Sequence, residues 1–324
     1  MKMTYAQSLN HTLDQLLETD EDVILIGQGT TSPWYVGTTT KGLIEKYGPE
    51  RIIDTPVSES AVTGMSTGIA IAGLRPIIMH PRQDFTWLAM DAIANQMANW
   101  EYMFGYRITI PVTIWSIINR GGEQAAQHSQ ALQAVYSHIP GLKVVAPSNP
   151  GNLKGLLRAA VYDKHPVVVI DDRWLYKLEG EVPETKYQFP IGKATIAKEG
   201  EDITVITGSW TTSQTLKAAE RLQDLISVEV IDLLTYKPLD TGIIEKSVRK
   251  TGKALVVDAG WKTCGLAAEI VTQIVESGAA IQTIKRLTLP DTPAPASRKL
   301  EREYYIDADK IKLEIQKAFY EGSI

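Results

Sequence analysis

The feature that most constrains the fold is a series of short, continuous apolar runs separated by segments with helical periodicity. Five runs predict strands in the first half: Val23–Ile26, Ile77–Met79, Val112–Trp115, Val144–Ala146 and Val167–Ile170. The segments between them predict helices: Tyr5–Leu17, Ala61–Ala72, Trp87–Phe104, Ser129–His138 and Asn152–Tyr162. Continuous rather than alternating apolar runs are typical of parallel strands buried on both faces. The first half is therefore predicted to be an α/β domain.

The second half repeats the pattern. Strands are predicted at Ile203–Thr207, Val228–Ile231, Ala254–Val257 and Thr283–Leu287, and helices at Thr212–Leu225, Thr241–Thr251 and Gly265–Glu276. The stretch KLEGEVPETKYQFP is polar, contains proline and interrupts the hydrophobic periodicity. We therefore predict a first domain at residues 1–176, a linker at 177–192 and a second α/β domain at 193–324.

Composition excludes several classes of protein. With 33 basic and 38 acidic side chains the net charge is -5, so no polycationic face for nucleic acid is expected. No run of 18 apolar residues exists, and the first residues lack the apolar core of a signal peptide. Cys264 is the single cysteine, so neither an internal disulfide nor a cysteine-based metal site is expected. We predict a soluble, cytoplasmic protein without a membrane or nucleic-acid partner.

Common catalytic and nucleotide motifs are missing. The sequence contains no G-x-x-x-x-G-K-[ST], no H-E-x-x-H, and no complete G-x-G-x-x-G after a strand. The absence of these motifs weakens interpretation as an NTPase, a metalloprotease or a dinucleotide-dependent dehydrogenase.

Three places in the first half carry side chains suited to chemistry. Glu59 is the first residue of a predicted apolar helix. Its carboxylate is either stabilised there by the helix dipole alone or belongs to a site near the ends of parallel strands. His128 follows a buried strand on a loop, and it is either structural or an acid–base group. The segment from His80 through Arg82 to Phe85 follows another strand, and it is either a polar loop or a rim that binds anions and aromatic rings.

The sequence resembles the β subunit of the thiamine-diphosphate-dependent decarboxylating component of 2-oxo acid dehydrogenases, within the transketolase-like superfamily. The resemblance rests on segments found in the same order along nearly the whole chain: IDTPVSES, DFTWLAMDAIANQ, AAQHSQAL, HIPGLKVVAPSNP, VVDAGWKTCGLAAEI and LPDTPAPASRKLE. It implies two transketolase-like α/β domains, the first of which binds the pyrimidine ring of thiamine diphosphate.

The resemblance also implies roles for individual residues. Glu59 matches the glutamate that hydrogen-bonds the pyrimidine ring nitrogen and promotes loss of the thiazolium proton. Phe85 matches an aromatic side chain that packs on the pyrimidine. His128 matches a histidine on the substrate side of the thiazolium. Gln28 stands near the cofactor where many relatives carry an acidic residue, and His80 and Arg82 make the substrate side more polar and cationic.

One expected motif is absent from this chain. Proteins of this superfamily hold the diphosphate and magnesium with a GDG motif followed by an asparagine, and no GDG occurs in the sequence. Magnesium requires several oxygen ligands together with the phosphates. The resemblance therefore implies an α-type partner subunit that holds magnesium and the diphosphate, with no metal site in this chain. It also implies an α2β2 heterotetramer with a β–β contact.

The predicted function is that of an enzyme subunit active only with its α-type partner. It would decarboxylate a 2-oxo acid and transfer the acyl unit, as pyruvate dehydrogenase does, with a lipoyl acyltransferase as a further candidate partner. The first alternative is a split transketolase-like transferase that moves a ketol or acyl unit to a sugar-like acceptor. The second is a non-catalytic interface subunit, against which Glu59 and His128 both argue.

Overall fold

The computed structural model describes residues 1–321, which form two compact units. One unit contains Met1–Arg120 and Gln127–Ile191, and the other contains Gly121–Ala126 and the chain from Gly192 onward. The predicted α/β architecture is confirmed, whereas the domain limits at 176 and 193 stay a prediction. Within the stretch predicted as a linker, β8 (Glu179–Glu181) pairs antiparallel with β1 (Lys2–Thr4).

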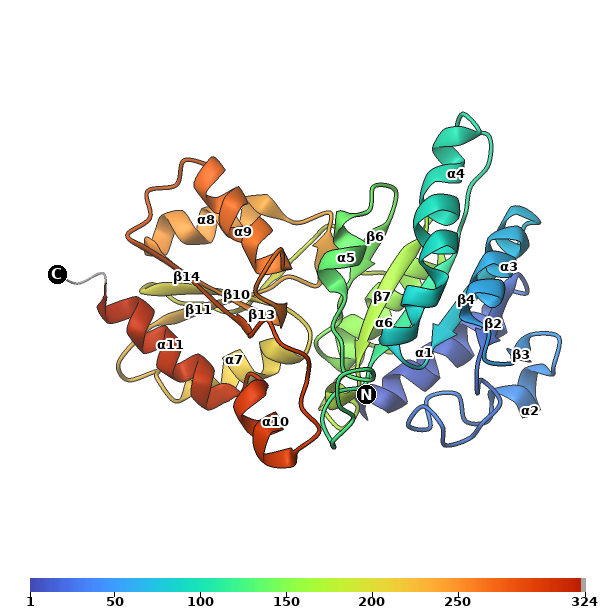
Figure 1. The fold of residues 1–324 in the computed structure, drawn as a ribbon, viewed down its shortest axis with the longest axis horizontal. Coiled ribbons are helices and arrows are strands. Elements are labelled where there is room, and N and C mark those ends of the chain that lie inside the picture. The colour runs from blue at the N-terminus through green and yellow to red at the C-terminus, as the bar shows by residue number, and fades with distance from the viewer. Residues whose placement is uncertain (322–324) are drawn as a thin grey trace. The chain divides into compact units, whose positions relative to one another are not determined.

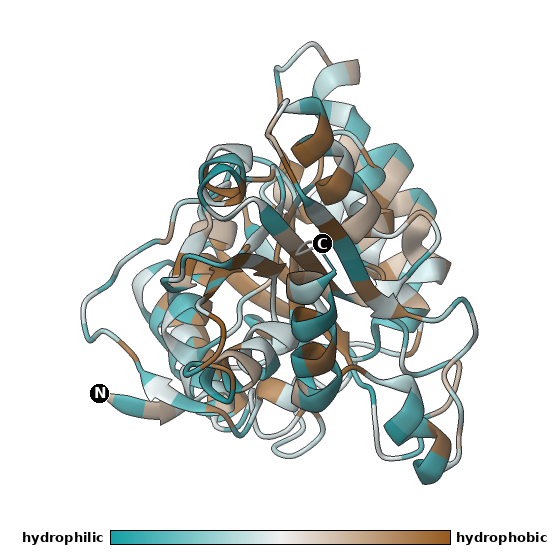
Figure 2. Ribbon diagram, turned by 90° about the vertical axis from the view of Figure 1, so that its left-hand side faces the viewer, coloured by the Kyte–Doolittle hydropathy of each residue, from teal (hydrophilic) through white to brown (hydrophobic). Residues whose placement is uncertain are grey.

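The first unit is built on parallel strands that lie side by side in the order β6-β7-β5-β4-β2-β3. Their bounds are β2 (Val23–Gly27), β3 (Ile52–Asp54), β4 (Arg75–His80), β5 (Thr113–Ile118), β6 (Lys143–Val145) and β7 (Val167–Asp172). The residues of β2, β5 and β7 are buried along their whole length, as the continuous apolar runs predicted. Hydrophobic residues are concentrated in strands like these in the interior (Figure 2).

Helices cover this sheet: α1 (Tyr5–Thr19), α2 (Leu43–Tyr47), α3 (Glu59–Ile71), η1 (Gln83–Ala89), η2 (Asp91–Met97), α4 (Ala98–Met103), α5 (Gln133–His138), α6 (Pro150–Val161) and η3 (Arg173–Leu175). Helices α1 and α6 pack together, and α3 packs against η1, η2 and β4. Both α1 and α6 begin with capping boxes, which satisfy otherwise unpaired amides at the first turn.

The single helix predicted at Trp87–Phe104 is wrong in detail. The chain instead forms a 3₁₀ helix, η1, then a π helix, η2, and only then the α-helix α4. Apolar periodicity reports which face is buried but does not separate these hydrogen-bond patterns. The helix predicted from residue 129 is also shorter, because residues 129–132 are held in a loop before α5.

The second unit has a sheet in the order β14-β13-β10-β11-β9, in which only β9 is antiparallel to its neighbour. The strands of this sheet are β9 (Thr195–Lys198), β10 (Ile203–Thr207), β11 (Val228–Asp232), β13 (Lys253–Trp261) and β14 (Thr283–Leu289). The unit also contains β12 (Thr235–Lys237), which is not part of this sheet. Its helices are α7 (Trp210–Glu220), α8 (Thr241–Thr251), α9 (Leu266–Glu276), α10 (Arg298–Tyr304) and α11 (Ala308–Tyr320). Helices α8 and α9 cover one face of the sheet, and α7 and α11 cover the other (Figure 1).

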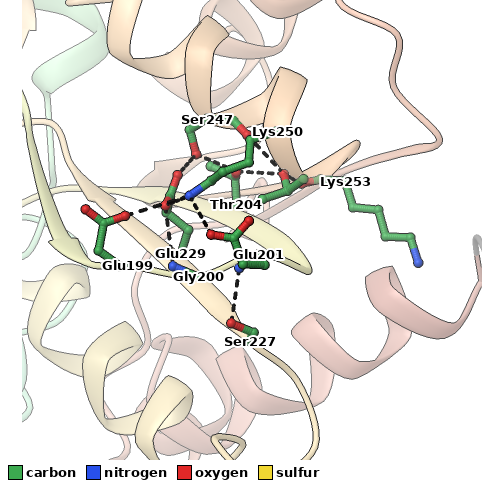
Figure 3. Close-up of polar contacts among 10 residues, drawn as sticks. Glu199, Gly200, Glu201, Thr204, Ser227, Glu229, Ser247, Lys250 and Lys253 are labelled. Carbon is green, nitrogen blue, oxygen red and sulfur yellow. Dashed lines mark hydrogen bonds and ion pairs between the residues drawn. The ribbon is translucent and has the colours of Figure 1, made fainter.

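A buried polar cluster ties α8 to this second sheet (Figure 3). Glu229 on β11 is fully buried, and its carboxylate accepts hydrogen bonds from Ser247 and Lys250 of α8. The amide of Gly200 also donates to this carboxylate, at 3.4 Å. A buried carboxylate is stable only when such donors replace water, so this cluster fixes the position of α8.

Within residues 1–321, no helix combines the length and the apolar character needed to cross a bilayer.

Candidate functional site

The predicted site residues lie at the carboxyl edge of the first unit's sheet. Strand β2 has β3 on one side and β4 on the other, so the chain reverses its direction across the sheet at this point. Ligand sites of open α/β sheets form at such reversals. A small cleft that is open to solvent occupies the place, and its lining residues are Gly27, Gln28, Thr55, Pro56, Ser58, Glu59, Val62, Ile78, Met79, His80 and Pro81.

Gly27 lines this cleft at the end of β2. Its φ is +150°, and a Cβ at this position would lie 2.4 Å from the carbonyl oxygen of Met79 on β4. Any larger residue would push β2 and β4 apart, so the close approach of the two strands requires glycine. The Gly27 carbonyl accepts the amide of Thr55, which ties the segment before α3 to the same strand end.

Gln28 lines the cleft on the loop that follows β2. Its side-chain amide donates to the hydroxyl of Tyr35 at 3.3 Å. The loop is fixed by Asp54 at the end of β3, which accepts the amide of Gly29 at 2.6 Å and the hydroxyl of Thr31 at 2.7 Å. The position of Gln28 thus depends on contacts across two strand ends.

Glu59 is the first residue of α3 and faces the cleft half-buried. Pro56 disfavours the helical conformation at Thr55, the residue before it, and the helix begins at Glu59, directly after its N-cap residue Ser58. A carboxylate in the first turn also interacts favourably with the helix dipole. The buried face of α3 is mostly small: Val62, Thr63, Ser66, Thr67 and Ala70. These small side chains let the helix lie close to β4.

His80 also lines the cleft, as the last residue of β4 rather than the first residue of a loop as predicted. It is 3% exposed, and a hydrogen bond of 3.2 Å links its Nε2 to the Thr63 hydroxyl. Burial lowers the pKa of His80 to about 4. The imidazole is therefore neutral near pH 7, and it acts in the cleft as a hydrogen-bonding group rather than as a cation.

Arg82 lies two residues further on, at the start of η1, and is half-buried. Its Nη1 donates to the Pro81 carbonyl at 2.9 Å, while its buried Nε has no hydrogen-bond partner within the described chain. Burial lowers the pKa of the guanidinium; the nearby Arg173 lowers it further, whereas Tyr35 and Asp84 raise it. This cation therefore retains unused hydrogen-bonding capacity.

Phe85 and His128 are brought together although 43 positions separate them in the sequence. Their rings meet edge to face, with centroids 5.4 Å apart and planes at 83°. This geometry is a favourable one for aromatic pairs. Phe85 belongs to η1, which packs against the helix that Glu59 begins. The structure thus forms two groups, Gln28, Glu59 and His80 on the cleft and Phe85 with His128 beside η1; their functional roles stay predictions.

Residues that the sequence did not single out hold the His128 loop. Asp84 accepts the amide of Gln130 at 3.0 Å, and the side chain of Gln83 accepts the amide of Leu132 at 2.6 Å. Gln83 and Asp84 are both buried, which is unusual for polar and charged side chains. Their burial is evident only in the folded structure, so the sequence alone could not identify them. In the described residues, no group of three or more His, Cys, Asp or Glu side chains is placed to hold a metal.

The side chains that line the cleft have the chemistry to contact a flat heteroaromatic ring. Glu59 offers a carboxylate acceptor and Gln28 offers an amide, while Pro56, Val62 and Met79 supply apolar walls. Ligand sites commonly combine apolar walls with a few polar groups that orient the ligand. The residues present therefore fit the pyrimidine ring that the resemblance implied.

Comparison with known proteins agrees with this architecture. Residues 1–179 match the family described as "Transketolase, pyrimidine binding domain", and residues 192–311 match "Transketolase, C-terminal domain". A solved structure described as a split gene transketolase, inactive beta4 tetramer, has a TM-score of 0.79 at 20% identity and covers 98% of each chain. At that identity the likeness shows the fold alone.

Three relatives are more similar in sequence. The chain is 38% identical to the acetoin:2,6-dichlorophenolindophenol oxidoreductase subunit beta of Cupriavidus necator, over 99% of this chain and 98% of the relative. It is 38% identical to the 2-oxoisovalerate dehydrogenase subunit beta of Bacillus subtilis, over 96% of each. It is 37% identical to the mitochondrial pyruvate dehydrogenase E1 component subunit beta-1 of Arabidopsis thaliana, over 93% of this chain and 85% of the relative. The chain belongs to the family of transketolase-like β subunits that includes those of pyruvate dehydrogenase E1 and 2-oxoisovalerate dehydrogenase, which confirms the resemblance found in the sequence.

Proposed function

We propose that this chain is the pyrimidine-binding β subunit of a thiamine-diphosphate-dependent 2-oxo acid dehydrogenase that decarboxylates its substrate. The observation that carries the proposal is the half-buried carboxylate of Glu59, which faces a cleft with apolar walls at the carboxyl ends of β2 and β4. The dehydrogenase names of the relatives support this function over the split-transketolase alternative. The cleft supports it over a non-catalytic interface subunit.

Each side chain of the site would have a distinct task. Glu59 would bind the pyrimidine ring nitrogen and exchange a proton with it, Gln28 would donate a hydrogen bond beside the ring, and Phe85 would pack against it. When bound, thiamine diphosphate supplies the electron sink that allows the bond between the carbonyl carbon and the carboxylate of a 2-oxo acid to break. His128 would hold or donate a proton at the substrate carbonyl.

Two further groups would act on the substrate. Arg82 would bind its carboxylate through the guanidinium nitrogens that protein acceptors do not use, a geometry that lysine cannot reproduce. The neutral imidazole of His80 would hydrogen-bond to a polar group of the ligand in place of Thr63.

The proposal includes a second chain. The relatives are named β subunits, which implies an α subunit in their assemblies. We propose that an α-type partner binds the diphosphate and magnesium in an α2β2 assembly with a β–β contact. A lipoyl acyltransferase would accept the acyl unit.

The test is Glu59→Gln in the assembled enzyme. The amide is nearly isosteric but cannot exchange the proton, and losing such a group typically costs about 10²–10⁴-fold in rate. Exchange of the thiazolium C2 proton, followed by NMR after rapid quenching, reports the step directly. Glu50→Gln, an exposed position outside the cleft lining, is the matched control. Unchanged exchange in Glu59→Gln would refute the assignment.

A further inference from the structure

Glu301 is a buried carboxylate that the proposed function has not used. It is the last residue of LPDTPAPASRKLE, one of the segments that carry the family resemblance, and it lies on α10 in the second unit. Only 6% of its surface is exposed. Both of its carboxylate oxygens accept the backbone amide of Glu123, at 3.0 and 3.1 Å. A carboxylate is costly to bury without donors, so this contact offsets part of that cost.

Glu123 lies in the long loop between β5 and α5, which also carries His128. The chain enters the second unit at Gly121 and rejoins the first unit at Gln127. The contact between Glu123 and Glu301 is therefore internal to the second unit. The segment that the second unit holds ends directly before Gln127, and His128 is the next residue along the chain.

The backbone of this segment has a conformation that needs support from its surroundings. The φ angle is +65° at Glu123 and +59° at Ala125, in the left-handed region that residues with a Cβ adopt only at a cost in free energy. Gly121 and Gly122 adopt the same region without this cost. Such conformations persist where other contacts hold them, and at Glu123 that contact is the carboxylate of Glu301.

A second contact links Glu123 to α10, and it is weaker. The carboxylate of Glu123 lies 3.6 Å from Nη2 of Arg298, and the two side chains are 48% and 71% exposed. Exposed ion pairs contribute little to stability, because water and salt screen them. The hydrogen bond from the Glu123 backbone to the buried Glu301 is therefore the contact that fixes this part of the loop.

His128 lies between two fixed points of the loop, Glu123 and Gln130, whose backbone amides both donate to buried carboxylates. The chain between these points spans residues 124–129. Without Glu301 the span between fixed points would extend back toward β5, and a longer span has more conformations. The imidazole would then be placed less precisely.

We propose that Glu301 is a positioning residue for His128. It acts through the backbone of Glu123, because holding this residue in the left-handed region fixes the direction in which the chain continues to Gln127 and His128. The inference rests on the proposed function, since it needs the role that His128 has there. It gives the second unit a part in the reaction, which is to place the loop that carries the acid–base group.

The test compares four substitutions in the enzyme assembled with its α-type partner. Glu301→Ala removes the acceptor of the Glu123 amide, and Glu301→Gln keeps one oxygen that can accept it. Glu123→Ala removes the exposed ion pair and keeps the backbone amide. Glu303→Gln, at an exposed position on the same helix, is the matched control. For each variant we would measure steady-state kinetics, exchange of the thiazolium C2 proton, and amide hydrogen exchange by mass spectrometry.

We expect Glu301→Ala to lower kcat by about 10- to 100-fold, because a misplacement of about 1 Å can cost a catalytic group about 10²-fold. KM and thiazolium exchange should stay within about threefold of wild type, because neither depends on the placement of His128. Amide exchange of the peptide that contains Glu123 should become about tenfold faster or more, because a hydrogen bond to a charged group is lost. Glu301→Gln should have a smaller effect, and Glu123→Ala and Glu303→Gln should match the wild type.

A double variant tests whether Glu301 acts through His128. In a His128→Ala background, Glu301→Ala should lower kcat by less than about threefold, because the group that it positions is already absent. A further loss as large as that of Glu301→Ala alone would overturn the proposal, since the two residues would then act independently.

Two other outcomes would overturn it. One is an unchanged kcat in Glu301→Ala although the loop exchanges faster. The other is a general loss, in which thiazolium exchange falls together with kcat and the α11 peptides also exchange faster. The proposed function fails in a different way: if His128→Ala leaves kcat unchanged while Glu301→Ala still speeds amide exchange at residues 123–129, the hold of Glu301 on the loop stands and the catalytic role of His128 fails.

Discussion

The strongest stability prediction concerns Lys250, whose ammonium group pairs with the buried Glu229 in the second unit (Figure 3). Lys250 is in the last turn of α8, and it also lies 3.5 Å from Glu201 and 3.7 Å from Glu199. Lys250→Met keeps the length of the side chain and removes its charge. The Glu229 carboxylate is then left buried without its cation.

The expected cost follows from this geometry. Removing one partner of a fully buried ion pair typically costs about 3–5 kcal/mol. Here Ser247 and Gly200 still donate to Glu229, and the side chain of Lys250 is 31% exposed, so water reaches its end of the pair. We therefore expect Lys250→Met to lower the unfolding free energy of the second unit by about 2–3 kcal/mol.

The control variants isolate the buried carboxylate. Lys317→Met removes an exposed pair with Glu314 on α11 and should change the unfolding free energy by less than about 0.5 kcal/mol. The double variant Lys250→Met with Glu229→Gln removes both charges and should be more stable than Lys250→Met alone. Hydrogen exchange of β11 and α8 peptides by mass spectrometry measures this unit by itself. Equal protection in Lys250→Met and Lys317→Met would refute the reasoning.

The same pair predicts a dependence on pH. Burial opposes the charge of Glu229, but the hydrogen bonds from Lys250, Ser247 and Gly200 outweigh it and lower the pKa of the carboxyl below its ordinary 4.5. Stability from this group is therefore present above pH 4.5 and is lost as the pH falls through the lower folded value. The hydrogen bond to Glu229 raises the pKa of Lys250 above 10.5, so its contribution is lost only at higher pH. The difference between wild type and Lys250→Met should shrink on acidification below about pH 4.5, which acid titrations of both proteins can measure.

Three further predictions concern the candidate site. The isolated chain should bind thiamine diphosphate with magnesium weakly or not at all in calorimetry, because contacts to the phosphates and the metal carry much of such binding; tight binding would place the diphosphate site in this chain. Arg82→Ala should mainly raise KM for an anionic substrate, whereas His128→Ala should lower kcat with thiazolium exchange nearly unchanged, and steady-state kinetics separate the two. Gly27→Ala should destabilise the first unit by about 2–4 kcal/mol in denaturant titrations, because the new Cβ would collide with the Met79 carbonyl. Gly48→Ala is the control, because Gly48 also has a positive φ but open space around it, and it should cost about 1 kcal/mol.

The strands were predictable from the sequence because parallel strands buried on both faces leave continuous apolar runs. The predicted run at Ile203–Thr207 coincides with β10, and Val167–Ile170 falls within β7. Helix α11 was missed, although Asp307 caps it and Ile311 and Ile315 give it helical spacing. Charged residues are frequent in this helix, so its few buried residues did not stand out as an apolar face in the sequence. The structure shows that the helix packs against α7.

The site was predictable only in part. The resemblance indicated Glu59 and His128 because each lies in a short motif of the family, IDTPVSES and AAQHSQAL. The contacts of Gln83 and Asp84 were not predictable, because they join η1 to a loop 46–49 positions away and depend on the 3₁₀ geometry of this segment. The neutral state of His80 also follows from burial, which no local pattern reports.

The charges around the cleft support the proposal that a second chain binds the diphosphate of the cofactor. Of the described residues that line the cleft, Glu59 supplies a carboxylate, none is lysine or arginine, and burial keeps His80 neutral. Such a lining favours a ring that can be protonated, and it repels a diphosphate. A ligand with both parts must therefore place its anionic end against a surface that provides cations, backbone amides or a metal. The cleft has side chains suited to the ring end of the ligand only. The proposal that this cleft binds the pyrimidine ring therefore includes a partner subunit that binds the diphosphate.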